Sequence, residues 1–148
     1  MFERNARTLD SVMSVRQGDE KLGDAGDAGT RRVLVVDDEE SIRILLSEIL
    51  SDLGYSVSVA ADGLTAIDLL GSHSFDLIIT DCNMPGVGGL EVVKAAKQID
   101  PRCPIMVTSG HPSSEAAVRL IGHPRAMYMQ KPFSVELLQQ TAAKLIEG

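Results

Sequence analysis

From Arg31 onward, short apolar runs alternate with longer segments in which apolar residues recur every three or four positions. Runs of four to six apolar or β-branched residues have the length of strands, and the wider spacing is typical of amphipathic helices. The pattern predicts strands at Val33–Val36, Tyr55–Ala60, Asp76–Thr80, Pro104–Thr108 and Ala126–Gln130. It predicts helices over residues 39–53, 64–70, 90–99, 112–121 and 135–146, the last of them capped by Ser134.

Strands and helices alternate five times, which favours a parallel sheet with helices on both faces. The predicted fold class is therefore α/β, a doubly wound five-stranded parallel sheet of flavodoxin-like order 2-1-3-4-5 with five helices. The apolar run Leu77–Ile79 suits a strand buried on both faces. This strand order places the first and third strands side by side at the switch point, where open α/β sheets bind their ligands.

Residues 1–30 have a different composition, with Gly, Asp and Ala dominating from residue 23 to residue 29. Such a composition is typical of a flexible linker. Thr8–Val15 could form one short amphipathic helix, although three turns alone are marginal in water. We expect a flexible N-terminal arm over residues 1–30, with a partner-binding arm as the alternative, and one domain over residues 31–148.

The composition narrows the classes of function. The 148 residues carry a net charge of -7, which argues against a nucleic-acid surface because phosphate neutralisation needs clustered cations. No apolar run approaches the roughly 20 residues that span a bilayer, and the N-terminus lacks the apolar core of a signal peptide. We therefore expect a cytoplasmic protein without membrane contact. Cys82 and Cys103 are isolated, as expected of reduced thiols, and the three histidines lack the spacing of a zinc site.

Acidic residues follow two of the predicted strands. Asp37 and Asp38 come after the first strand, and Asp81 comes after the third. Three carboxylates in one crevice repel one another unless a cation is present, and Mg²⁺ prefers such oxygen ligands. The Asn83 carbonyl could add another ligand. In the alternative, Asp37 and Asp38 only cap the next helix and Asp81 only begins a turn.

Two more polar residues follow the fourth and fifth strands at the same edge of the predicted sheet. Ser109 offers a hydroxyl and Lys131 an ammonium group, and both could bind the oxygens of a phosphoryl group held by Asp81. Taken singly, Ser109 is an ordinary turn residue and Lys131 a solvated lysine. Together with the acids, they make Asp81, Ser109 and Lys131 the candidate catalytic residues for covalent phosphoryl transfer to a carboxylate.

Four motifs fall at the expected strand ends in this order: Asp37-Asp38, Asp81-Cys82-Asn83-Met84-Pro85 with Gly89, Thr108-Ser109-Gly110 and Lys131-Pro132-Phe133. Together they resemble the receiver domain of bacterial two-component response regulators. The resemblance extends from Arg31 to Gly148 and implies a signalling module that catalyses only its own phosphorylation and dephosphorylation.

The resemblance also implies roles for single residues. Asp81 would accept a phosphoryl group from the phosphohistidine of a sensor histidine kinase or a histidine phosphotransfer protein. Mg²⁺ would be bound at Asp81, directly by Asp38, mainly through water by Asp37, and by the main-chain carbonyl of Asn83. Lys131 would pair with the phosphoryl group, and the bond from Lys131 to the following proline would be cis.

By the same resemblance, Ser109 would be the switching hydroxyl that moves toward the phosphoryl oxygen. Thr108 is the competing candidate, but strand alternation points only one of the two at the site, and the position along the strand favours Ser109. Tyr128 would be the aromatic switch, with an ordinary strand-end aromatic as the alternative. Activation would change the surface formed by residues 112–121, 126–130 and the last helix, where a downstream protein target would bind.

The sequence departs from the family pattern at Gly88, where Asp or Asn is common, and over residues 122–125. These departures predict a looser loop after Asp81 and a shortened helix before residue 122. The nearest enzymatic alternative is a Mg²⁺-dependent aspartyl-phosphate hydrolase, which needs a second acid where this sequence has Asn83. A flavodoxin-like cofactor binder is disfavoured because acids, not a Gly-rich phosphate loop, follow the first strand. The chain stops soon after the last predicted helix, so we expect a stand-alone receiver acting as a diffusible switch or a phosphorelay shuttle.

Overall fold

The computed structural model describes residues 29–148. In this part of the chain, five strands form one parallel sheet in the order β2-β1-β3-β4-β5, which confirms the predicted topology. The strands are β1 Arg32–Val36, β2 Ser56–Ala60, β3 Leu77–Asp81, β4 Ile105–Ser109 and β5 Ala126–Gln130. The helices are α2 Glu40–Asp52, α3 Gly63–Ser72, α4 Gly89–Ile99, α5 Ser114–Ile121 and α6 Val135–Glu147.

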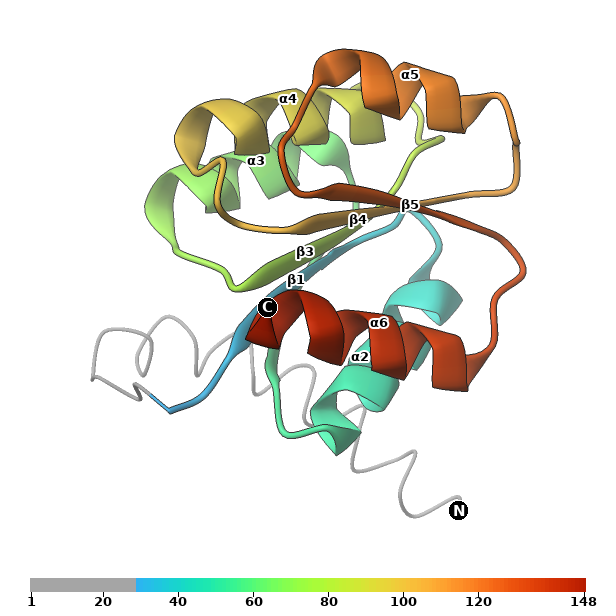
Figure 1. Cartoon of the computed structure of the whole chain (residues 1–148). Coiled ribbons are helices and arrows are strands. Elements are labelled where there is room, and N and C mark those ends of the chain that lie inside the picture. Colours follow the sequence, from blue (N-terminus) through green and yellow to red (C-terminus); the bar gives the residue numbers. More distant parts are fainter. Residues whose placement is uncertain (1–28) are drawn as a thin grey trace.

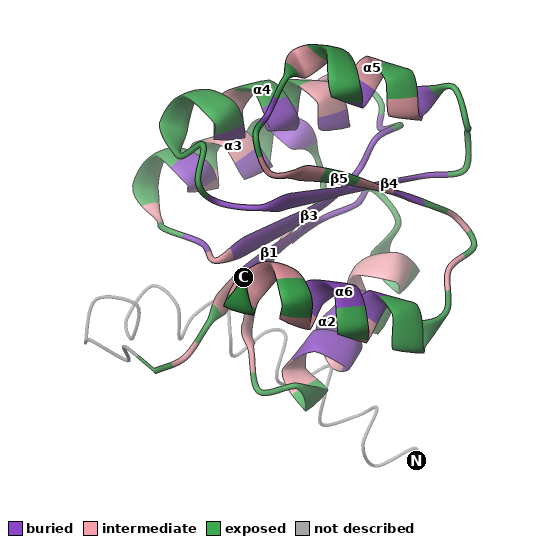
Figure 2. Ribbon diagram, in the orientation of Figure 1, coloured by how far each residue is buried: buried purple, intermediate pink, exposed green. Residues whose placement is uncertain are grey.

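The helices cover both faces of the sheet. Helices α3, α4 and α5 lie on one face, and α2 and α6 lie on the other (Figure 1). Alternate residues of β1 divide between the two faces: Leu34 and Val36 join the core cluster under α3–α5, whereas Val33 and Val35 join the cluster under α2 and α6. The sheet is therefore the buried middle layer, and exposed residues gather on the outer sides of the helices (Figure 2).

The last residue of two strands is a predicted site residue. Asp81 ends β3 and Ser109 ends β4, one residue beyond the predicted ends. The strands continue because their main chains still pair, Asp81 with Thr108 and Ser109 with Gln130. Both side chains consequently sit on rigid backbone at the carboxyl edge of the sheet.

Helix boundaries follow local capping chemistry. Ser134 caps α6 as predicted, since its hydroxyl accepts a hydrogen bond from the Leu137 amide at 3.0 Å. Helix α5 begins at Ser114, two residues later than predicted, and ends at Ile121, where Gly122 follows with a φ of 73°. Glycine adopts this left-handed conformation without steric penalty, which explains why the helix stops there.

None of the helices in residues 29–148 is long and apolar enough to cross a bilayer. The predicted N-terminal arm, including the possible helix over residues 8–15, lies almost wholly outside the described residues. It stays a prediction.

Candidate functional site

The three predicted acids lie together at the carboxyl edge of the sheet. Strands β1 and β3 are neighbours, so the segment after β1 and the end of β3 meet. One carboxylate oxygen each from Asp37, Asp38 and Asp81 lies within 4.8 Å of the others. Asp37 and Asp81 are buried and Asp38 is exposed. The cluster is thus anchored in the protein and open to solvent on one side.

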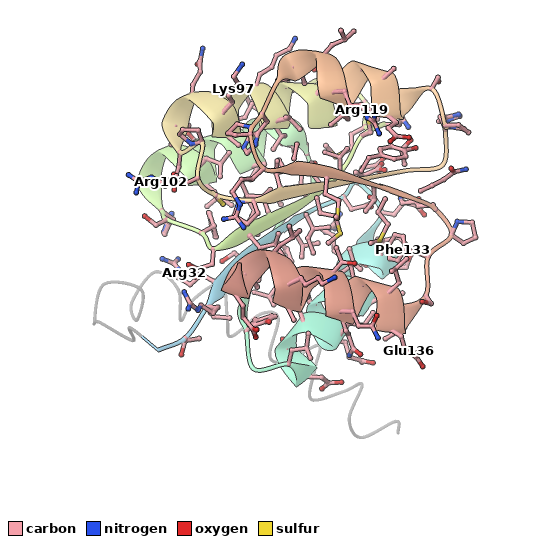
Figure 3. The ribbon with its side chains drawn as sticks, viewed as in Figure 1. Arg32, Lys97, Arg102, Arg119, Phe133 and Glu136 are labelled. Carbon is pink, nitrogen blue, oxygen red and sulfur yellow. The ribbon has the colours of Figure 1, made fainter. Side chains whose placement is uncertain are left out.

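Lys131 supplies a positive charge to this cluster from the end of β5. Its Nζ lies 3.2 Å from Asp81 Oδ1 and 3.5 Å from Asp37 Oδ2. The Lys131-Pro132 bond is cis, as the resemblance implied. Phe133 packs against the core cluster under α2 and α6, which ties the segment after Lys131 to the domain (Figure 3).

Burial and the neighbouring charges shift the pKa values of Asp81 and Lys131 in this cluster. Burial has the largest influence on Asp81 and raises the pKa of its carboxyl; Lys131 lowers it, and the charges of Asp37 and Asp38 raise it again. Burial by itself would lower the pKa of Lys131, but the charges of Asp37 and Asp81 raise it above the ordinary value. One lysine therefore does not neutralise the three carboxylates.

Asp37 also makes local contacts at the start of α2. Its Oδ1 accepts a hydrogen bond from the Glu39 amide at 2.9 Å, and its main-chain oxygen accepts one from Arg43 at 2.7 Å. Glu39 is the N-cap residue of α2 and makes no side-chain cap bond. One oxygen of Asp37 therefore makes a local turn with Glu39 and the other faces Lys131, and neither makes a side-chain cap bond to α2.

A divalent cation fits this group of residues. Hard cations such as Mg²⁺ take carboxylate oxygens as ligands and retain several waters, which an open acidic cluster permits. The three carboxylates carry more negative charge than Lys131 neutralises, and the pKa of Asp81 is raised. A bound cation would stabilise the charged form of these carboxylates.

The predicted switch residues contact the loops that follow β3 and β4. Ser109 is fully buried, and its hydroxyl accepts a hydrogen bond from the Asn83 side-chain amide at 2.9 Å. Thr108 pairs in register with Asp81 and is also buried. Tyr128 donates from its hydroxyl to the main-chain oxygen of His111 at 2.8 Å. Ser109 is thus connected to the loop that follows Asp81, and Tyr128 to the loop that follows Ser109.

A comparison with known families agrees with this arrangement. The family model of the response regulator receiver domain matches residues 33–143 of this chain. The chain belongs to this family. Receiver domains are signalling modules of two-component systems, so the fold and the group of acids belong to a signalling protein.

Two curated relatives match this receiver over nearly their whole length. The chemotaxis protein CheY of Pseudomonas aeruginosa is 29% identical over 119 residues, which cover 78% of this chain and 96% of CheY. Sporulation initiation phosphotransferase F of Bacillus subtilis is 29% identical over 115 residues, covering 78% and 93%. Longer relatives match in part: this receiver spans 46% of the mycobacterial response regulator MprA, at 36% identity over 107 residues.

A solved structure of the family is similar to this receiver throughout the domain. The response regulator TrrA of Thermotoga maritima, solved in complex with Mg(2+)-BeF, is 32% identical, with a TM-score of 0.71. The comparison covers 78% of this chain and 99% of TrrA.

Sequence reasoning missed Ser114, and it included Gly89 in a motif without identifying what Gly89 contacts. The hydroxyl of Ser114 lies 3.1 Å from that of Ser109, and Gly89 packs against the main chain of Asp81. Ser114 precedes the buried Val118 by four residues, so helical spacing could have placed it on the inner face of α5. No local signal identifies the contact of Gly89, because it depends on the approach of α4 to β3.

Proposed function

We propose that this receiver is a phosphoacceptor response regulator in which Asp81 takes a phosphoryl group from the phosphohistidine of a sensor histidine kinase or a histidine phosphotransfer protein. An Asp81 oxygen attacks phosphorus, the P–N bond to the donor histidine breaks, and its electron pair returns to the imidazole. The observation that carries the proposal is the contact of Asp81 with Lys131 at 3.2 Å inside a cluster of three acids.

In this proposal Mg²⁺ is held by Asp37, Asp38, Asp81 and the main-chain carbonyl of Asn83. The bound cation supplies charge neutralisation for the phosphoryl oxygens. The named ligand of TrrA, Mg(2+)-BeF, supports this choice by similarity. Lys131 stabilises the negative charge that phosphoryl transfer brings to the site, in addition to the charge of the carboxylates.

Phosphorylation brings roughly two negative charges to the end of β3. Ser109 would donate a hydrogen bond to the phosphoryl group, and Tyr128 would change its position with the loop that follows β4. We propose that the surface of α5, β5 and α6 responds to this change and binds a downstream protein target in the cytoplasm.

Labelling by acetyl phosphate tests the assignment of the acceptor. In the presence of Mg²⁺, Asp81→Asn should abolish incorporation of phosphate, because the attacking carboxylate oxygen is lost. Asp68→Asn, which alters an exposed acid on α3, is the matched control and should label like the wild type. Undiminished labelling of Asp81→Asn would refute the assignment.

A further inference from the structure

The hydroxyl of Ser109 has a complete set of hydrogen-bond partners. Its oxygen accepts from the Asn83 side-chain amide at 2.9 Å and from the His111 amide at 3.0 Å. A hydroxyl has two lone pairs and a single proton. These two bonds use both lone pairs, so only the acceptor of the Ser109 proton is left to assign. Ser114 Oγ lies 3.1 Å away and the main-chain oxygen of His111 lies 3.4 Å away. The shorter distance makes Ser114 the acceptor of the Ser109 proton.

Helix α5 places Ser114 in this position. Ser114 is the first residue of the helix and is buried, whereas its neighbour Ser113 is exposed and makes no side-chain cap bond. The main-chain amide of Ser114 donates to the oxygen of His111 at 3.0 Å. The Ser114 hydroxyl also hydrogen-bonds the buried Cys82 thiol. This hydroxyl therefore points into the protein and connects Ser109 to the segment that follows Asp81.

We propose that Ser114 is a positioning residue that holds the Ser109 hydroxyl away from the acceptor carboxylate and so opposes phosphorylation of Asp81. The inference rests on the proposed function. To donate its proton to a phosphoryl oxygen, Ser109 must first give up the hydrogen bond to Ser114. Breaking that bond contributes to the free energy that the switch requires. Removal of the Ser114 hydroxyl should therefore lower the free energy of switching.

The same contacts extend the effect to the outer surface. The main-chain oxygen of His111 accepts both the Tyr128 hydroxyl and the Ser114 amide. The His111 amide in turn donates to Ser109. A movement of Ser109 consequently disturbs the main chain at His111, whose carbonyl oxygen is bonded to both α5 and β5.

The test is a titration with beryllofluoride, a phosphoryl analogue, at saturating Mg²⁺, followed by the tyrosine fluorescence of the protein, to which Tyr55 and Tyr128 contribute. Ser114→Ala should bind the analogue about threefold to tenfold more tightly than the wild type, as expected when one neutral hydrogen bond no longer has to be broken. Ser113→Ala, the matched control on the exposed side, should bind like the wild type. Ser114→Thr keeps the hydroxyl and should also retain the wild-type affinity.

A double variant distinguishes the positioning of Ser109 by Ser114 from a general effect of the Ser114 substitution on the structure. In Ser109→Ala the hydroxyl that Ser114 holds is absent, so adding Ser114→Ala should leave the affinity for beryllofluoride unchanged. The affinity for Mg²⁺ alone should be equal in the wild type and in the single variants of Ser113 and Ser114. An unchanged or weaker affinity in Ser114→Ala, or an equal gain in the Ser109→Ala background, would overturn the inference while the proposed function stands. A wild type that binds no beryllofluoride would overturn both.

Discussion

Asp81 is a buried carboxylate between two other acids and one lysine, and these neighbours determine its chemistry. Burial raises the pKa of its carboxyl most, Lys131 lowers the pKa, and the charges of Asp37 and Asp38 raise it. The charged form of Asp81 is thus disfavoured in the folded protein when no cation is bound. A neutral side chain of the same shape relieves this repulsion, which makes the amide substitution informative.

We expect Asp81→Asn to raise the free energy of unfolding at pH 7 in Mg²⁺-free buffer by about 1 kcal/mol. The folded carboxyl has the higher pKa, so its contribution to stability is complete at low pH and is lost as the pH rises through the raised pKa. The increase in the free energy of unfolding caused by Asp81→Asn should therefore disappear as the pH falls below the ordinary pKa of aspartate. Urea denaturation at several pH values measures this, with Asp68→Asn as the control. An Asp81→Asn protein less stable than the wild type at pH 7 would contradict the expectation.

Helix α4 begins directly against the end of β3. The Gly89 amide donates to the Cys82 main-chain oxygen at 3.1 Å. A Cβ atom at Gly89 would collide with the main chain of Asp81 and Cys82, whereas a Cβ at Gly71, in α3, would meet nothing within 4 Å. The approach of α4 to β3 thus requires glycine at position 89 and supports the backbone that carries Asp81.

Gly89→Ala should reduce the free energy of unfolding by about 1–3 kcal/mol, the usual effect of overpacking, because α4 must move away from β3. It should also slow phosphate labelling, since the backbone of Asp81 moves. Gly71→Ala tests the same chemical change at an open position in a helix, where about 0.5–1 kcal/mol of stabilisation is expected. Chemical denaturation and acetyl phosphate labelling of both variants give the comparison. Equal stability of the two variants would show that α4 accommodates the methyl group.

At the scale of the whole molecule, the sheet order joins segments that are far apart in the chain. Lys131 and Asp37 are 94 residues apart, yet their charged groups lie 3.5 Å from each other. Figure 3 shows that charged side chains such as Lys97 and Arg119 lie on the α4–α5 side, and Glu136 lies on the opposite side, on α6. The acid cluster lies at one edge of the sheet between the two helical layers, so a cation bound there would connect β1 with β3.

Mg²⁺ should therefore stabilise the entire fold. At 100 times its Kd, a ligand that binds only the folded state adds about 2.7 kcal/mol to the free energy of unfolding. Thermal unfolding with and without Mg²⁺ measures the shift in Tm. Asp38→Asn, which removes one carboxylate of the cluster, should reduce the shift, and Asp68→Asn should not. A Tm that is independent of Mg²⁺ would argue against a cation site.

The sequence by itself determined the class of fold and the edge at which the chemistry lies. Hydrophobic periodicity is a local property, and it located five strands and five helices to within a few residues. The rules for parallel sheets then placed Asp37, Asp38, Asp81 and Lys131 at one edge, because every carboxyl end of a parallel sheet lies on the same side. The local capping of α6 by Ser134 was equally visible, since it involves residues only three apart.

Only the tertiary structure decided how the Ser109 hydroxyl is held and why position 89 must be glycine. The bonds of Ser109 join residues from three separate segments, and the contact of Gly89 depends on how closely α4 approaches β3. Whether such contacts form depends on side-chain rotamers and on packing, and differences of a few tenths of an ångström are enough to make or break them. Periodicity and spacing along the chain carry no information at that distance.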